Sequence, residues 1–302
     1  MIRGSLIKST LAGTALALAG GVTAQDNPNQ PPAHSADWPG LASGTETDQR
    51  AASIAQGPEL TRGVSVREMV RQEKLLLATL DSIEPQRPGI VDAYVVTVAL
   101  DSDPVFAREA REAAKVLSRR YGGEGRTITL AGPDGSRDDL PQGSIRALTL
   151  ALARIAATMD RNEDVLVLYS TSHGLPAGLA YHYGDTGYGI LAPERFQSIL
   201  EELGIERRIL ILSACYSGVF VPALASDNTA SLTASADNRT SFGCSPENDW
   251  TFFGDALINN ALRKPQSIEA ASREANLAIA GWEAQARVPA SLPQVQIGEG
   301  VG

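Results

Sequence analysis

The chain has 302 residues, of which 43% are hydrophobic and 20% are charged, and it carries a formal net charge of −9. This length suits one or two domains, and the composition allows a buried core that needs no disulfide or metal ion to hold it together. The negative charge comes without a cluster of Lys and Arg. This argues against nucleic-acid binding, which ordinarily begins with a basic patch.

The first 24 residues have the pattern of a secretory signal peptide. Arg3 and Lys8 precede the apolar stretch 11–22, which is too short to span a bilayer comfortably, and small residues at 22–24 suit a signal peptidase. A membrane anchor is the alternative interpretation of this stretch. We expect cleavage before Gln25, export to the periplasm or out of the cell, and no stable membrane anchor after cleavage.

Residues 25–62 are rich in Pro, Asn, Gln, Ser, Gly and Asp. Because such a segment buries little apolar surface, we expect a disordered leader. The remainder, residues 63–302, predicts one folded domain. Its first element is a helix over 65–82, where apolar residues recur at helical spacing until Pro85 and Pro88 stop the helix.

Strands and helices alternate from residue 91 to the end of the chain. Runs of apolar and β-branched residues predict strands over 91–100, 126–130, 164–170, 208–213, 230–236 and 293–297. Helical spacing and capping residues, among them Asp103 before Pro104, predict helices over 103–121, 144–159, 193–203, 250–262 and 267–286, with a hairpin over 178–190. This alternation indicates an α/β fold in which crossover connections build a mainly parallel sheet covered on both faces.

Two of the predicted strands run directly into reactive residues. His173 and Gly174 follow the strand at 164–170, and Cys215 follows the strand at 208–213. Ligands of an open parallel sheet bind beyond the carboxyl ends of its strands, and neighbouring strands lie about 5 Å apart. A cysteine attacks as the thiolate, which a nearby imidazole or helix start stabilises, so the pattern predicts Cys215 as nucleophile and His173 as general acid and base. The backbone N–H groups of Gly174 and Cys215 are the predicted donors to a developing oxyanion.

Five short motifs lie along the predicted domain. They are QRPG at 86–89, STSHG at 170–174, LSACYSG at 212–218, RTSFGC at 239–244 and WTFFG at 250–254. In this order they resemble the motifs of the legumain-like cysteine peptidases, the peptidase C13 family of the caspase–legumain clan, and in particular its bacterial exported members. The resemblance covers about residues 66–298.

The resemblance implies a caspase-like three-layer αβα sandwich with a mainly parallel six-stranded sheet. It also implies a cysteine endopeptidase that hydrolyses peptide bonds through a Cys–His dyad and a thioester acyl-enzyme. Such an enzyme acts on peptide or protein substrates and uses no metal ion or other cofactor. The chain departs from the family pattern at Asn238, which separates Asp237 from Arg239 where an Asp-Arg pair is expected.

Three further residues are candidate substrate-binding residues. Asp101, Asp237 and Arg239 lie near the predicted carboxyl ends of strands, where substrate side chains bind. Helix caps and surface ion pairs are the alternative use of such residues. His182, flanked by two tyrosines in the predicted hairpin, is expected to line the cleft at most.

The second cysteine, Cys244, is interpreted as a packing or loop residue. A disulfide between Cys215 and Cys244 is the main structural alternative, and it would abolish nucleophilicity. No cysteine or carboxylate is expected to complete a metal-ligand set with His173 and His182, so no metal site is predicted. Transpeptidation by an amine that resolves the acyl-enzyme, and a non-catalytic peptide-binding module of the same fold, are the alternative functions. The sequence predicts no oligomeric state.

Overall fold

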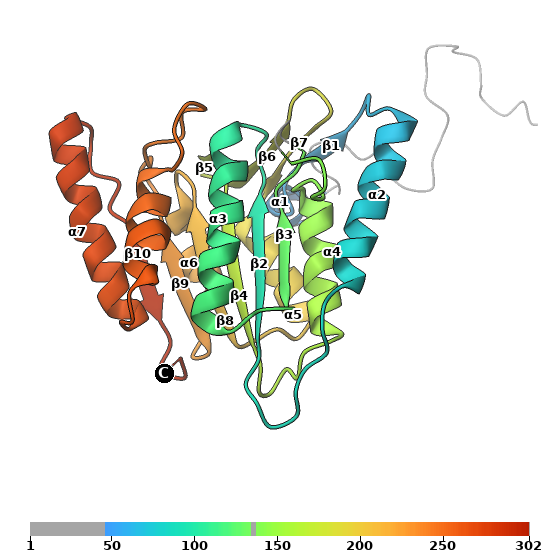
Figure 1. Ribbon diagram of the computed structural model, residues 1–302. Helices are drawn as coiled ribbons and strands as arrows, with labels where there is room; N and C mark the ends of the chain where they lie inside the picture. Colours follow the sequence, from blue (N-terminus) through green and yellow to red (C-terminus); the bar gives the residue numbers. More distant parts are fainter. Residues whose placement is uncertain (1–45, 134–136, 302) are drawn as a thin grey trace, which may run out of the picture. The chain divides into compact units, whose positions relative to one another are not determined.

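A computed structural model describes residues 46–133 and 137–301 of the chain (Figure 1). Its central feature is a six-stranded sheet with the strand order β10-β9-β8-β4-β2-β3. Neighbouring strands are parallel except that β10 runs antiparallel to β9 at one edge. The strands are β2 (Ala93–Ala99), β3 (Thr127–Leu130), β4 (Val165–Thr171), β8 (Arg208–Ser213), β9 (Thr229–Thr233) and β10 (Gln294–Ile297). The predicted mainly parallel six-stranded sheet is confirmed.

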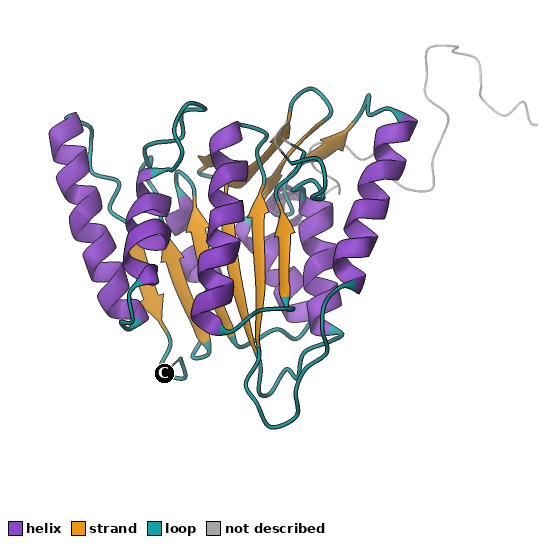
Figure 2. Cartoon of the chain, in the orientation of Figure 1, coloured by secondary structure: helices purple, strands orange, loops and turns teal. Residues whose placement is uncertain are grey.

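Helices cover both faces of this sheet, as Figure 2 shows with helices in purple and strands in orange. One face packs against α3 (Pro104–Tyr121) and α7 (Ile268–Ala286), and the other against α2 (Val66–Asp81), α4 (Ile145–Ala156) and α5 (Pro193–Glu202). Because helices cover both faces, β2 and β8 are buried along their whole lengths and consist mostly of apolar residues. The predicted three-layer α/β class is therefore confirmed.

Local signals set most element boundaries within a few residues of the predicted ones. The hydroxyl of Ser65 accepts the first-turn hydrogen bond of α2, and α3 ends at Gly122 in the left-handed conformation, with φ 69°. The helix predicted over 250–262 is different, because it is a π-helical segment, Gly254–Asn260, followed by a 3-10 turn, Ala261–Arg263. Apolar spacing alone does not distinguish these closely related helices from an α-helix.

A smaller sheet has the strand order β1-β7-β6-β5. The predicted hairpin is confirmed as β6 (Gly178–Tyr183) and β7 (Gly187–Leu191), and β5 (Gly174–Leu175) follows His173 directly. The outer strand of this sheet, β1 (Glu59–Thr61), pairs antiparallel with β7. The smaller sheet thus joins a segment from the start of the described chain to the residues next to His173.

The prediction of a disordered leader is wrong for residues 46–62. This segment contains α1 (Thr47–Ala55) and β1, and Glu59 of β1 forms an ion pair with Arg195 of α5 at 3.0 Å. Its order comes from pairing with a strand more than 100 residues away, which local composition does not indicate. The predicted signal peptide at 1–24 and the leader residues 25–45 lie outside the described residues. None of the helices in the described part of the chain has the length and apolar character needed to span a bilayer.

Candidate active site

The two reactive strand ends lie side by side in the central sheet. β4 and β8 are neighbouring parallel strands, and Thr171 at the end of β4 is in register with Ser213 at the end of β8. The next backbone N–H, that of Ser172, donates to the carbonyl oxygen of Ser213 at 3.1 Å. His173 and Cys215 each follow these register partners by two residues. They therefore occupy equivalent positions at the same edge of the sheet.

The loop after β9 supplies hydrogen bonds to the sulfur of Cys215. The backbone N–H of Ser241 donates to Cys215 Sγ at 3.2 Å, and the Ser241 hydroxyl lies 3.6 Å from the same atom. The hydrogen bond from the Cys244 thiol is the largest of the causes that lower the pKa of Cys215 to about 5, ahead of Ser241 and the charge of His173, while burial opposes them. These contacts favour the thiolate form of Cys215.

The sequence did not identify Ser241 as part of the site, and it predicted Cys244 to be a packing or loop residue, with a disulfide to Cys215 as the alternative. Both residues belong to the RTSFGC motif at 239–244, so the motif itself was the available signal. The motif does not indicate the path of the loop, which folds back over the end of β8. Both cysteines are free thiols, so the alternative Cys215–Cys244 disulfide is not formed.

A sharp turn follows the thiol. Tyr216 has a left-handed backbone conformation, with φ 57° and ψ 11°, and its N–H donates to the carbonyl oxygen of Arg239 at 2.8 Å. The 3-10 turn Ser217–Val219 and the short helix α6 (Phe220–Leu224) come next. The low pKa of the thiol therefore derives from side-chain and loop hydrogen bonds rather than from the start of a long helix.

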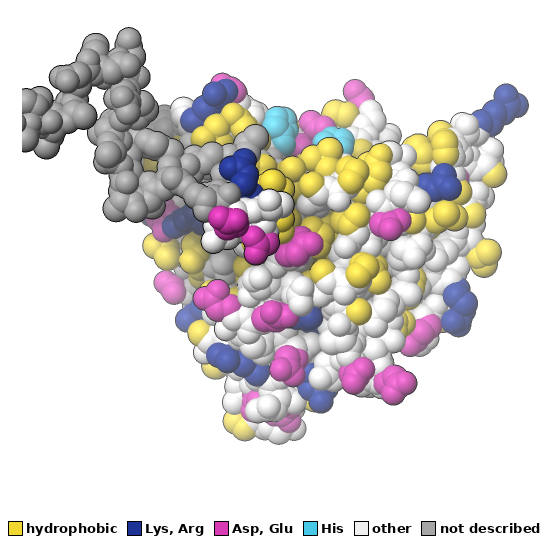
Figure 3. Space-filling model, turned by 180° about the vertical axis from the view of Figure 1, so that it is seen from behind, with side chains coloured by type: hydrophobic (Ala, Val, Ile, Leu, Met, Phe, Trp, Pro, Cys, Tyr) yellow, Lys and Arg dark blue, Asp and Glu magenta, His cyan; other side chains and the backbone are white. Residues whose placement is uncertain are grey.

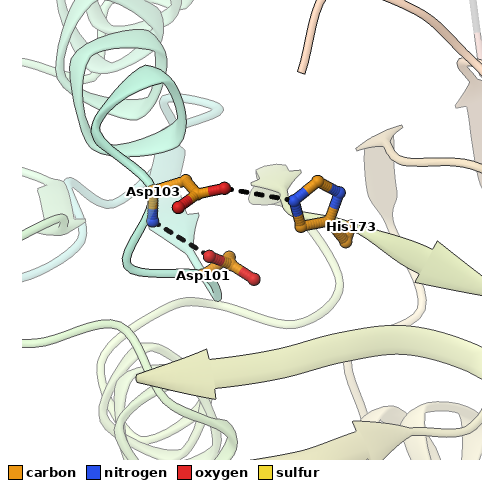
Figure 4. A group of neighbouring side chains, drawn as sticks. All are labelled: Asp101, Asp103 and His173. Atoms are coloured by element: carbon orange, nitrogen blue, oxygen red, sulfur yellow. Dashed lines mark hydrogen bonds and ion pairs between the residues drawn. The ribbon is translucent and has the colours of Figure 1, made fainter. Parts of the chain in front are cut away.

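Asp103 is the charged partner of His173. Its Oδ2 lies 3.3 Å from His173 Nε2 (Figure 4). The imidazole also packs edge-to-face against the ring of Phe106, with ring centroids 5.0 Å apart. The sequence pattern predicts Asp103 as the helix cap of α3, yet its side chain makes no capping hydrogen bond. The carboxylate is instead directed to the imidazole.

Asp101 holds the backbone of Asp103 in place through a hydrogen bond. One of its carboxylate oxygens accepts the backbone N–H of Asp103 at 2.9 Å, and the other lies 3.5 Å from His182 Nδ1. The side chain of Asp101 is only 2% exposed, which argues against the predicted contact with substrate. Its position instead fixes the start of α3 and with it the partner of His173.

The same residues bring three possible metal ligands together. One ligand atom from each of Asp101, Asp103 and His173 lies within 4.8 Å of the other two. The sequence did not indicate this group, because it forms only when the end of β2, distant in sequence, carries two carboxylates to the end of β4. Oxygen and imidazole ligands suit a divalent cation. Such an ion would compete with the hydrogen bonds that these carboxylates already make.

Gly174 is required by a close approach of two backbone segments. A Cβ at this position would lie 1.9 Å from the carbonyl oxygen of Cys215, so only glycine allows β5 to pass so near. The backbone beside the imidazole and the backbone of the thiol are therefore in contact. The oxyanion role of the Gly174 and Cys215 N–H groups stays a prediction.

Asp237 and Arg239 lie in the loop after β9, next to the turn that follows Cys215. The carbonyl oxygen of Arg239 accepts from Tyr216, and the backbone of Asp237 lies so close to Gly218 that a Cβ there would be 2.5 Å from the Asp237 nitrogen. Both side chains are exposed. Their roles in substrate binding stay predictions.

The site is open to solvent. The side chains of His173 and His182 are 45% and 52% exposed. Figure 3 shows the histidines of the described chain in cyan at the rim of the molecule, among hydrophobic side chains. A substrate therefore has direct access to the imidazole.

The α/β fold thus carries a thiol and an imidazole beyond the ends of neighbouring parallel strands. The model of the peptidase C13 family matches residues 147–299, half of the chain, and this stretch contains both His173 and Cys215. The chain belongs to the peptidase C13 family, as its motifs predict, and is a hydrolase of the cysteine-peptidase type.

Among solved structures, the chain is similar to caspase-1 from Spodoptera frugiperda, with a TM-score of 0.44 and 13% sequence identity. The alignment covers 72% of this chain and 93% of that chain. No curated protein matches this chain.

Proposed function

We propose that the chain is a cysteine endopeptidase in which Cys215 is the nucleophile and His173 is the general acid and base. The proposal is carried by the position of these two residues at equivalent sites beyond neighbouring strand ends, and the lowered pKa of Cys215 supports it. An ordinary cysteine is mostly protonated at neutral pH. A lowered pKa in a solvent-accessible position is typical of a reactive thiol.

In the first half of the proposed reaction, the Cys215 thiolate attacks the carbonyl carbon of the peptide bond. A sulfur–carbon bond forms, and the carbonyl oxygen becomes an oxyanion that accepts hydrogen bonds from the predicted N–H donors of Gly174 and Cys215. The carbon–nitrogen bond then breaks as protonated His173 gives its proton to the leaving amine. The product is a thioester between the substrate and Cys215.

In the second half, water resolves the thioester. Neutral His173 takes a proton from the water as the water oxygen attacks the thioester carbon, and the carbon–sulfur bond breaks. The carboxylic acid product leaves and Cys215 returns to the thiolate, with His173 protonated. The hydrogen bonds from Ser241 and Cys244 favour this step because they stabilise the sulfur as a leaving group.

Asp103 has a supporting role in both halves. A carboxylate 3.3 Å from Nε2 fixes the orientation of the ring, which leaves Nδ1 as the nitrogen that exchanges protons with substrate. The aromatic ring of Phe106 packs edge-to-face against the imidazole and so restricts its rotation. Asp103 is thus proposed as a positioning residue rather than a residue that touches substrate.

The test is cleavage of an unfolded protein substrate, with products identified by mass spectrometry. Cys215→Ala is expected to abolish cleavage. His173→Ala is expected to lower it by at least about 100-fold, since general acid–base catalysis contributes about that much. His182→Ala is the matched control at the same rim and should lower activity far less. Cleavage by Cys215→Ala at the wild-type rate would refute the proposal.

Two finer points of the proposal have their own readouts. Addition of an amine nucleophile distinguishes hydrolysis from transpeptidation, because a transpeptidase joins the amine to the new carboxyl end of the product. Export to the periplasm or beyond is proposed from the signal-like pattern of residues 1–24, and N-terminal sequencing of the mature protein checks it.

A further inference from the structure

A second thiol lies against the nucleophile. The chain has two cysteines, and Cys244 donates the hydrogen bond that most lowers the pKa of Cys215. Ser241, three residues earlier in the same loop, donates its backbone N–H to the same sulfur at 3.2 Å. One loop therefore brings both Ser241 and Cys244 to the site of Cys215.

Packing holds the second thiol in place. Cys244 is half-buried and lies against an apolar cluster beneath the start of α3, made up of Ala99, Val105, Phe106, Ala107, Ala110 and Ala131. Phe106 of this cluster also packs edge-to-face against the imidazole of His173. The cluster that packs against Cys244 thus also contacts the imidazole of the proposed site. The second thiol is therefore a fixed part of this site.

We propose that Cys244 is a resolving thiol for Cys215, so that a peroxide-class oxidant closes a Cys215–Cys244 disulfide and switches the enzyme off reversibly. The inference rests on the proposed function in taking Cys215 as the reactive thiol. A low-pKa, solvent-accessible thiolate is the form of cysteine that peroxides oxidise, and an adjacent thiol is what prevents its further oxidation.

The reaction proceeds in two balanced steps. The Cys215 thiolate attacks one oxygen of hydrogen peroxide, the O–O bond breaks, and the departing hydroxide takes a proton to become water, leaving Cys215 as a sulfenic acid. The sulfur of Cys244 then attacks Cys215 Sγ, an S–S bond forms, and the S–O bond breaks. The departing hydroxide and the Cys244 proton make a second water. Two thiols are oxidised by two electrons in total, and the peroxide is reduced.

The order of these steps follows from the electrostatics of the pair. In the resting site, the hydrogen bond to the Cys215 thiolate is the main cause that raises the pKa of Cys244, followed by burial and by the charge of Cys215. A sulfenic acid carries no such charge, so oxidation of Cys215 removes two of these causes. Cys244 therefore becomes easier to ionise after Cys215 is oxidised, and the disulfide that then forms has an S–S length of about 2.05 Å.

The experiment uses the full chain, reduced and then treated with a small excess of hydrogen peroxide. Free thiols are blocked with iodoacetamide, and peptides are read by mass spectrometry with dimedone present to label sulfenic acid. In the wild-type protein we expect peptides joined through Cys215 and Cys244, and dithiothreitol should separate them. In Cys244→Ser we expect dimedone on Cys215 at low peroxide and irreversible sulfinic acid at higher peroxide. Cys244→Ala provides a second variant should the serine variant fold poorly.

The outcomes separate the inference from the proposed function. Wild-type protein in which Cys215 becomes sulfinic acid without joined peptides would overturn the inference, as would equal recovery of Cys215 by dithiothreitol in wild type and Cys244→Ser. Joined peptides support it whether or not a peptide substrate is cleaved. The proposed function fails instead if the reduced wild-type protein, with its disulfide open, cleaves no substrate.

Discussion

A buried carboxylate beneath the active site provides the sharpest test of how the fold supports it. Glu109 of α3 is fully buried and accepts hydrogen bonds from Thr171 Oγ1 at 2.8 Å, from the hydroxyl of Tyr169, and from the backbone N–H of Thr251 at 2.7 Å. The hydroxyl of Thr251 lies 3.1 Å from that of Ser213. Thr171 and Ser213 end the two strands that lead to the proposed catalytic pair, so this network joins both strands behind the site.

The loss of stability on substitution of Glu109 follows from the three donors whose hydrogen bonds its carboxylate accepts. Glu109→Ala leaves two hydroxyls and one backbone N–H buried without this acceptor, at about 1–3 kcal/mol for each donor that finds no other partner. The hydroxyls can turn to other acceptors but the N–H cannot, so we expect a loss of about 3–5 kcal/mol in the free energy of unfolding. Glu109→Gln keeps one acceptor oxygen for the N–H and should cost about 1–2 kcal/mol. These losses are large against a typical total of about 5–15 kcal/mol.

The assay is urea unfolding followed by circular dichroism, with the free energy extrapolated to water. Glu112→Ala is the matched control, because Glu112 lies on the same helix and makes ion pairs with Lys115 and Arg263 at the surface. It should change the free energy by less than about 0.5 kcal/mol. The reasoning is refuted if Glu109→Ala unfolds within about 1 kcal/mol of the wild type, or if Glu109→Gln is the less stable of the two.

Three further predictions concern the thiol, the imidazole and the turn beside them. Cys244→Ala removes the main cause that lowers the pKa of Cys215. The pH at which iodoacetamide alkylates Cys215 at half its maximal rate should therefore rise toward the ordinary thiol value, and an unchanged profile would contradict the assigned hydrogen bond. Asp103→Asn keeps the shape but loses the charge beside His173, so kcat should fall about 10- to 100-fold with little change in KM, and an equal loss in both would indicate a substrate contact. Gly174→Ala places a Cβ where the Cys215 carbonyl oxygen lies, so peptide cleavage should fall by about 100-fold or more while the protein remains folded by circular dichroism; full activity would disprove the close approach.

The sequence indicated the class of fold because the relevant signals are local. Continuous apolar runs such as 165–168 and 209–212 are typical of strands with both faces covered, and each is followed within a few residues by a histidine or a cysteine. Strand ends of a parallel sheet meet at one edge whatever the loops do. The pairing of His173 with Cys215 could therefore be predicted without knowledge of the loop paths.

Other features depended on contacts that no local pattern specifies. Asp103 has every local sign of a helix cap, and its contact with His173 arises because β2 and β4 are neighbours in the sheet. Residues 46–62 have the composition of a disordered segment, and β1 is ordered by pairing with β7.

The sequence by itself determined the family, the alternation of strands and helices, and the two residues of the proposed dyad, because periodicity and strand ends are properties of short segments. Only the tertiary structure decided the surroundings of the thiol. Ser241 and Cys244 reach Cys215 because a loop between β9 and the π-helical segment folds back over the sheet edge. The physical reason is that a loop path is the sum of many weak contacts with distant elements, and such a sum is not encoded in the few residues of the loop itself.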